Sequence, residues 1–232
     1  DATVSRASGA IAALMSALGA AAGAAADHFA SFGVAAANTL LPFLHARSPS
    51  ANAGTPGVGG VEASISSRVV TPGVLAACLD AAGAIMASSW AVPQFHAARE
   101  EFASLARQML TDAQLASEVR ASSHGFFASV ALASFEEFAK YLPQVVPVAI
   151  EVLQNQDTGD ASQGSGRRRA VRTALHEERV AAIRALGVYA AAVGPGFAVC
   201  LPSVLPAVCS QAQHASPDVL VAVADALGRL GR

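Results

Sequence analysis

Cysteine is scarce in this sequence, and its placement argues against a fold held together by disulfides or zinc. The chain has three cysteines, Cys78, Cys200 and Cys209, which is an odd number, and no two of them form a C-x-x-C pair. A disulfide framework needs paired cysteines, and a structural zinc site needs closely spaced ligands. We therefore expect buried, reduced thiols, as in cytosolic or nuclear proteins.

Charged residues and catalytic signatures are also sparse. Charged residues make up 14% of the chain and the net charge is −2, a balance that argues against a nucleic-acid-binding surface. The six histidines are scattered, and no H-E-x-x-H, G-x-S-x-G, P-loop or G-x-G-x-x-G motif is present. We expect no enzymatic activity, no cofactor and no metal. A pocket of convergent carboxylates or histidines would be the sign of an enzyme.

Long apolar stretches are present, but their composition disfavours a membrane span. Hydrophobic residues make up 53% of the chain, and residues 7–26 and 185–217 contain no Asp, Glu, Lys or Arg. The first stretch is mostly Ala and Gly, which are weakly apolar, and the second is interrupted by Pro195, Pro202 and Pro206. We expect no membrane insertion, and the N-terminus lacks the residue order of a secretory signal.

One phrase occurs twice and predicts a short helix. Residues 216–228 read SPDVLVAVADALG, and residues 71–83 read TPGVLAACLDAAG. Ser or Thr followed by Pro is typical of a helix start, and the closing Gly is typical of a helix C-cap. Between them, apolar residues recur every three or four positions and form one stripe: Val219, Ala222, Val223, Ala226 and Leu227.

Further copies of this helix, and proline-containing helices between them, indicate a repeat protein. The copies end near Gly19, Gly83, Ala128, Gly187 and Gly228. The helices between them carry Pro42, Pro93, Pro143, Pro147, Pro202 and Pro206. Without two low-complexity inserts, at about 45–70 and 155–169, the period is about 40 to 45 residues, as in HEAT or armadillo units.

The predicted fold is therefore all-α, an α-α superhelix. We expect a HEAT/armadillo-like solenoid of about four to five helix pairs, with residues 1–232 forming one segment and the two inserts projecting as loops. The chain begins inside a helical pattern and stops after a helix end without a polar capping repeat. The expected context is a longer superhelix of which this chain is an internal piece.

The stretch over residues 171–208 resembles the importin-β (karyopherin-β) family, particularly its receptors for ribosomal proteins and histones. The positions that fit the family pattern are Arg172, Thr173, Ala174, Glu178, Arg179, Ala185, Leu186, Gly187, Gly194, Phe197 and Leu201. Val199 and Cys200 depart from it, because Pro and an aromatic residue are usual there. Leu75 and Leu220 stand where HEAT units often carry Arg, whereas Arg120 keeps it, so the usual Asp-Arg ladder is interrupted twice.

The resemblance implies a nuclear import receptor that wraps basic protein cargo and is regulated by the GTPase Ran. It also implies contacts with nucleoporins and residence in both cytoplasm and nucleus. The alternative is a HEAT scaffold or adaptor subunit of a phosphatase, coat, translation or chromatin complex, which would not respond to Ran.

The candidate protein-binding residues are the charges on the last two copies of the repeated helix: Glu177, Glu178, Arg179, Arg184, Asp218 and Asp225. In a HEAT pair the second helix lines the concave side, so these charges are expected at or near one inner surface. The alternative interpretation is that they only solubilise the solenoid and bridge neighbouring repeats. A cluster of arginines, Arg167–Arg169 with Arg172, reads as a solvated loop, a localisation signal or a contact for an acidic partner.

Overall fold

The structure is a computed structural model that describes residues 2–46, 70–155 and 165–231. The side chains of residues 2–4, 26, 27, 30 and 165–174 are left out of this description. Every regular element in these ranges is a helix, and no strand occurs among them. The prediction of an all-α fold is confirmed.

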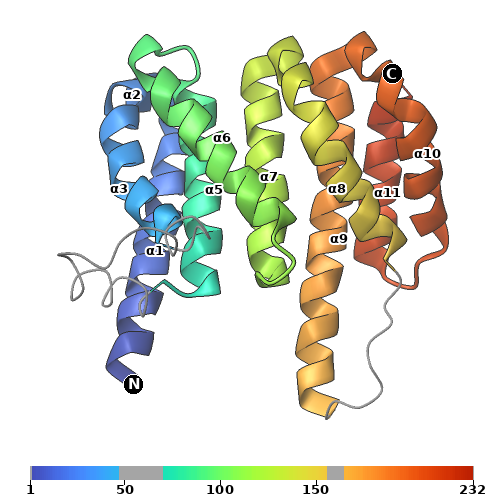
Figure 1. The fold of residues 1–232 in the computed structure, drawn as a ribbon, viewed down its shortest axis with the longest axis horizontal. Helices are drawn as coiled ribbons and strands as arrows, with labels where there is room; N and C mark the ends of the chain where they lie inside the picture. Colours follow the sequence, from blue (N-terminus) through green and yellow to red (C-terminus); the bar gives the residue numbers. More distant parts are fainter. Residues whose placement is uncertain (1, 47–69, 156–164, 232) are drawn as a thin grey trace, which may run out of the picture.

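The helices form two layers, and the chain alternates between them (Figure 1). The first layer holds the copies of the repeated helix: α1 (Ala2–Ala24), α5 (Pro72–Ser89), α7 (Ser117–Ser134), α9 (Ser165–Val193) and α11 (Pro217–Leu230). The second layer holds α3 (Gly33–His45), α6 (His96–Thr111), α8 (Leu142–Gln154) and α10 (Leu201–Ser210). Consecutive first-layer helices pack extensively on each other, whereas consecutive second-layer helices touch sparingly.

Short helical turns carry the chain between the layers. These are α2 (Ala26–Phe29), η1 (Ala30–Phe32), η3 (Pro93–Phe95), η4 (Phe135–Tyr141), η5 (Gly194–Cys200) and η6 (Gln211–Gln213). Phe138 in η4 and Phe197 in η5 are buried, and the Phe138 ring lies 4.8 Å from the Tyr189 ring of α9. Because such rings carry much apolar area, η4 and η5 are each fixed to the first layer by an aromatic anchor.

The repeated glycines lie inside helices, so the prediction that they are C-caps is wrong. α5 continues six residues past Gly83 to Ser89, and α9 continues past Gly187 to Val193. A Cβ built on Gly187 would lie 2.9 Å from the Cα of Ala226 on α11, and one on Gly19 would lie 2.9 Å from the Cα of Ala81 on α5. The glycine is needed because neighbouring helices of the first layer approach too closely for a side chain.

This close approach gives the first-layer helices a common register. We call Gly19, Gly83, Ala128, Gly187 and Gly228 the reference positions. The forward face of a helix is its reference position with the residues four and eight before it, and this face meets the following helix. The backward face is the residues two, six and nine before the reference position, and it meets the preceding helix. Ala226 and Ala81, which receive Gly187 and Gly19, are both backward-face residues.

The predicted helix starts are confirmed, although their chemistry differs. Thr71 caps α5, since its side chain accepts a hydrogen bond from the Val74 N–H at 3.4 Å, and Pro72 follows at the first position. Ser216 precedes Pro217 of α11 without capping it, and its Oγ lies instead 3.0 Å from Nε2 of His176. The second copy therefore uses its hydroxyl to contact a neighbouring helix rather than its own.

Prolines occupy three of the second-layer helices as predicted, whereas Pro93 lies in the turn η3 before α6. Pro42, Pro147 and Pro206 lie inside α3, α8 and α10, and each removes one backbone donor from its helix. The insert predictions fall largely on residues 47–69 and 156–164, which are outside the described residues. The second insert was predicted to run to residue 169, but α9 already begins at Ser165, so the backbone of Arg167–Arg169 is helical rather than part of a loop.

Three helical stretches are long and apolar enough to cross a membrane by length and composition. They are Ser5–Ala24, Pro72–Ser89 and Leu175–Gln213. The middle stretch is the most buried, since α5 lies between α1 and α7. The absence of membrane insertion stays a prediction.

Candidate protein-binding surface

A row of charged side chains follows the exposed side of the first layer. The residues three and ten positions before each reference position share one side of their helix, because seven residues make nearly two turns. We call this side the open face; its charged members are Asp80, Glu118, Glu177, Arg184, Asp218 and Asp225. All six are exposed. The open face is thus five acidic residues and one arginine spread over α5, α7, α9 and α11.

The open-face residues of α5 and α7 lie close together. A Cβ on Gly125, the open-face residue of α7, would lie 3.9 Å from Oδ1 of Asp80 on α5. Although Asp80 is exposed as a residue, partial burial of its carboxyl beside α7 raises the pKa of that group, and a hydrogen bond with the Ser122 side chain acts in the opposite direction. On α11, Asp225 pairs with Arg229 at 3.1 Å, and this pair is solvent-exposed.

Four of the six predicted binding residues lie on the open face. Glu177 and Arg184 are there on α9, and Asp218 and Asp225 are there on α11. The sequence-based selection missed Asp80 and Glu118, although Glu118 aligns with Asp218 in the repeated phrase and Asp80 aligns with Asp225. Alignment of all copies on the reference position would have found both residues.

Glu178 and Arg179 are not surface residues, and their assignment to a binding surface is corrected. Glu178 is 2% exposed and Arg179 is 7% exposed. Glu178 occupies the backward face of α9, where the equivalent residues are the buried Val119 of α7 and Val219 of α11. Both charged side chains are paired with groups on neighbouring parts of the fold, so neither is available to a partner.

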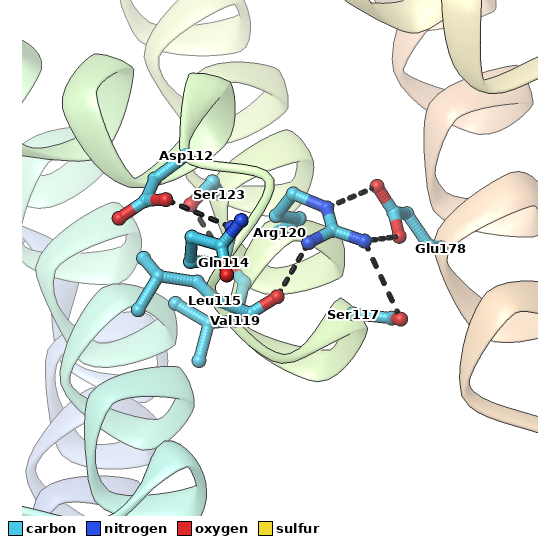
Figure 2. Close-up of polar contacts among 8 residues, drawn as sticks. All are labelled: Asp112, Gln114, Leu115, Ser117, Val119, Arg120, Ser123 and Glu178. Carbon is cyan, nitrogen blue, oxygen red and sulfur yellow. Dashed lines mark hydrogen bonds and ion pairs between the residues drawn. The ribbon is translucent and has the colours of Figure 1, made fainter. Parts of the chain in front are cut away.

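Glu178 forms a bidentate ion pair with Arg120, which lies on the forward face of α7 (Figure 2). Arg120 Nε lies 2.7 Å from Oε1 of Glu178, and Nη2 lies 2.8 Å from Oε2. The same guanidinium donates from Nη1 to the Leu115 carbonyl oxygen in the loop before α7. Such a pair is geometrically specific, because the planar guanidinium matches both carboxylate oxygens.

Arg179 continues this polar contact toward α8 and α11. Its Nη2 donates to the Asn155 carbonyl oxygen at 2.8 Å, and its Nη1 lies 3.1 Å from Nε2 of His214. His214 stacks on His176 with 5.8 Å between ring centroids, and its Nδ1 accepts from the Ser216 N–H at 3.1 Å. The arginine therefore joins the end of α8 to the segment that leads into α11.

One buried histidine lies beside this network. His124 is fully buried on the forward face of α7, one turn after Arg120. Burial and, to a smaller extent, the positive charge of Arg120 together lower its pKa to about 3. Neither ring nitrogen has a hydrogen-bond partner among the described residues. The side chain is therefore a neutral packing group over the whole physiological pH range.

Within the described residues, no group of three or more His, Cys, Asp or Glu side chains is close enough to hold a metal ion. No family model matches the chain, and no curated protein matches it either.

Proposed function

We propose that this chain is a HEAT-like helical scaffold that binds basic proteins through its open face, as part of a nuclear import receptor. The observation that carries this proposal is the recurrence of exposed acidic residues at equivalent positions on four successive helices. The proposed partners are basic protein cargo, the GTPase Ran and nucleoporins, and the proposed location is cytoplasm and nucleus.

The arrangement of the helices supports the HEAT-like part of the proposal. The chain alternates between two layers, and α1, α5 and α9 each meet the next first-layer helix in the same register, at Gly19, Gly83 and Gly187. An array in which each unit contacts only its neighbours is the architecture of a solenoid. Because the first layer is the more closely packed of the two, it would form the inner side of a curved array.

The charges support a basic partner. Among the described side chains of the open face, five are carboxylates and one is an arginine, Arg184; Arg229 lies beside this face and pairs with Asp225. Exposed carboxylates at a constant spacing attract a cationic surface, speed encounter and select against acidic partners. Each exposed charge contributes little alone, so affinity would come from engaging several helices at once.

Two features of the segment that resembles importins also fit. The segment runs from α9 through η5 into α10, and Gly194 at the turn has a φ of +60°, a backbone conformation suited to glycine. Phe197, three residues later, is buried against the first layer. Val199 and Cys200, where Pro and an aromatic residue would be usual, depart from the family pattern, and Val199 is 82% exposed.

The test is charge reversal on the open face of the complete 232-residue chain. The variant combines Glu177→Lys, Asp218→Lys and Asp225→Lys, and the probe is purified core histone, with affinity measured by fluorescence anisotropy at low and at high salt. We expect a loss of affinity of at least about tenfold at low salt, and a smaller loss at high salt because screening weakens the attraction.

A matched control changes the net charge equally but elsewhere. Glu136, Glu137 and Glu151 are exposed on η4 and α8, and their replacement by Lys should leave histone affinity nearly unchanged. Equal losses in both variants would mean that only net charge matters and would overturn the assignment of the open face. Far-ultraviolet circular dichroism would check that both variants remain helical.

Release of the bound histone by GTP-loaded Ran, and not by GDP-loaded Ran, would distinguish the import-receptor proposal from its alternative. A HEAT scaffold subunit of a phosphatase, coat, translation or chromatin complex would hold its partner regardless of Ran.

A further inference from the structure

The turns η4 and η5 are two versions of the same structure. Residues 135–143 and 194–202 align without gaps, and they share a phenylalanine, an alanine, a leucine and a proline at equivalent positions. The shared phenylalanines, Phe138 and Phe197, are both buried, and each turn leads into a second-layer helix. Because the two turns have the same buried framework, the residues in which their exposed sides differ are not needed to form the turn.

The first residue of the turn differs between the two copies, and in η4 its backbone is strained. Gly194 begins η5 with a φ of +60°, a conformation that glycine adopts freely. Phe135 begins η4 with a φ of 49° and a ψ of −123°, and it is the one non-glycine residue with a positive φ in the described part of the chain. A Cβ is disfavoured in this conformation, so the turn alone would be better served by glycine.

The Phe135 side chain does not offset this strain by packing, because it is 63% exposed. Its counterpart after α5, Trp90, is half-buried, and the Arg99 guanidinium lies 4.6 Å from the centre of its ring. Three residues before Phe135, Leu132 is 53% exposed, whereas α5 and α9 both carry alanine at the equivalent position. The end of α7 thus carries two large, exposed apolar side chains where α5 and α9 carry small or partly covered ones.

Carboxylates lie beside this apolar pair. Glu136 and Glu137 directly follow Phe135 and are exposed, whereas η5 has proline and glycine at these two positions. Lys140 of the same turn does not neutralise them, because its ammonium group pairs with the Glu100 carboxylate of α6 at 2.9 Å. The surface is therefore apolar and negatively charged, and it is complementary to a surface that is apolar and positively charged.

This surface lies in the middle of the array. The turn η4 joins α7 to α8, and α7 packs between α5 and α9 in the first layer (Figure 1). The surface is also separate from the open face, because the open-face residues precede the reference position of each helix, whereas Leu132 and Phe135 follow it.

We propose that Leu132, Phe135, Glu136 and Glu137 form a second protein-binding surface, and that its partner is a segment with a bulky apolar side chain flanked by Lys or Arg. The apolar side chain packs on Phe135 and Leu132, and the basic residues face the two carboxylates. Two exposed carboxylates contribute little alone, so the apolar contact supplies most of the affinity and the charges orient the partner. The strained, exposed phenylalanine then serves a partner rather than its own turn.

The first test compares the affinity of the 232-residue chain for two synthetic peptides. One peptide alternates leucine with lysine, and the other has alanine in place of every leucine, so both carry the same charge. Fluorescence anisotropy should show tighter binding of the leucine peptide, and Phe135→Ala should reduce this preference at least about tenfold, because the apolar contact is lost. The double variant Glu136→Gln with Glu137→Gln should weaken both peptides alike at low salt and keep the preference.

Replacement of a second exposed phenylalanine provides the control. Phe32 is also 63% exposed, but its φ is −97° and the residues beside it, Ser31 and Gly33, are uncharged. Phe32→Ala should therefore leave the preference for the leucine peptide unchanged.

The second test separates binding from folding. Phe135→Gly should unfold at a higher urea concentration than Phe135→Ala, as followed by circular dichroism, because glycine removes the strained Cβ whereas alanine keeps it. Both variants should lose the preference for the leucine peptide to the same extent. A residue that only shapes the turn would not give a glycine variant that is the more stable of the two and still binds poorly.

Three results would overturn the proposal. One is equal affinity of the native sequence for the two peptides. Another is a preference for leucine that survives Phe135→Ala, or that falls equally in Phe32→Ala, since the apolar contact would then lie on other exposed residues. The third is a lower urea midpoint for Phe135→Gly than for Phe135→Ala. Histone binding is assigned to the open face and should be the same in Phe135→Ala as in the native sequence, so the two proposals fail separately.

Discussion

Replacement of His124 by leucine should remove a large part of the acid sensitivity of this protein. His124 is fully buried between α7 and its neighbours without a hydrogen-bond partner among the described residues, and burial with the nearby Arg120 holds its pKa at about 3. Leucine has a similar volume, needs no hydrogen bond and does not titrate. The substitution therefore removes one pH-dependent contribution to the free energy of unfolding. Any difference in packing between histidine and leucine is the same at every pH.

The sign and size follow from proton linkage. In the unfolded chain the histidine has its ordinary pKa of 6.5, so below that pH the unfolded state binds a proton that the folded state refuses. Stability is fully present above pH 6.5 and is lost as the pH falls toward the folded pKa. At about 1.4 kcal/mol per pH unit, the loss between about pH 7.5 and about pH 4.5 is about 3 kcal/mol.

The assay is urea unfolding followed by far-ultraviolet circular dichroism across this pH range. The difference in unfolding free energy between the native sequence and His124→Leu should shift by about 3 kcal/mol in favour of the variant at the acidic end. The raised pKa of Asp80 works in the opposite direction, because its folded form holds a proton longer, but it is present in both proteins and cancels.

Replacement of an exposed histidine provides the control. His96 lies exposed on α6, and His96→Gln should keep the pH profile of the native sequence. If the profiles of the native sequence and His124→Leu stay parallel, to within about 0.5 kcal/mol, then His124 becomes protonated in the folded protein and the reasoning from its burial is wrong.

Three further predictions concern the contacts between helices and the thiols. Glu178→Val should lower the free energy of unfolding in urea by about 3 to 5 kcal/mol, because it leaves Arg120 buried without its partner. The double variant Arg120→Leu with Glu178→Val should recover most of this loss, since Leu and Val occupy the equivalent positions at the α5–α7 contact. Gly187→Ala should destabilise the protein by about 1 to 3 kcal/mol by forcing α9 from α11, whereas Gly228→Ala should stabilise it by up to about 1 kcal/mol. Alkylation followed by mass spectrometry should modify the exposed Cys209 first and spare Cys78, because burial raises the pKa of the Cys78 thiol to about 12.

The helical composition and the helix starts could be predicted from the sequence because those signals are local. Thr71 with Pro72 begins α5 and Ser216 with Pro217 begins α11, because a proline fits the first position of a helix; Thr71 also caps its own first turn. The apolar stripes likewise depend on spacing alone. These features needed no knowledge of what lies next to each helix.

The role of each glycine and charge could not be predicted in this way, because it depends on the neighbouring helix. A glycine near the end of an apolar stripe gives the same sequence pattern whether it ends the helix or lets a neighbouring helix pack closely against it. The contact of Gly187 with Ala226, which identifies the second role, is visible only in the structure. Glu178 and Glu177 are adjacent in sequence, but their side chains point about 100° apart, so one is buried on the backward face and the other exposed on the open face.

The contacts between first-layer helices combine a constant geometry with variable chemistry. The reference position is small in every copy, so the distance between helices is set by glycine or alanine along the whole array. Eight residues before the reference position, about two turns along the helix, the residue changes from Leu75 to Arg120 and Arg179 and back to Leu220. Arg120 on α7 is tolerated because α9 carries Glu178, rather than valine, opposite it. Arg179 on α9 is tolerated because it contacts the Asn155 carbonyl oxygen and the His214 ring. Polar pairing therefore favours the order α7, α9, α11 over any other order of these helices, because an apolar face would accept any helix of the same register.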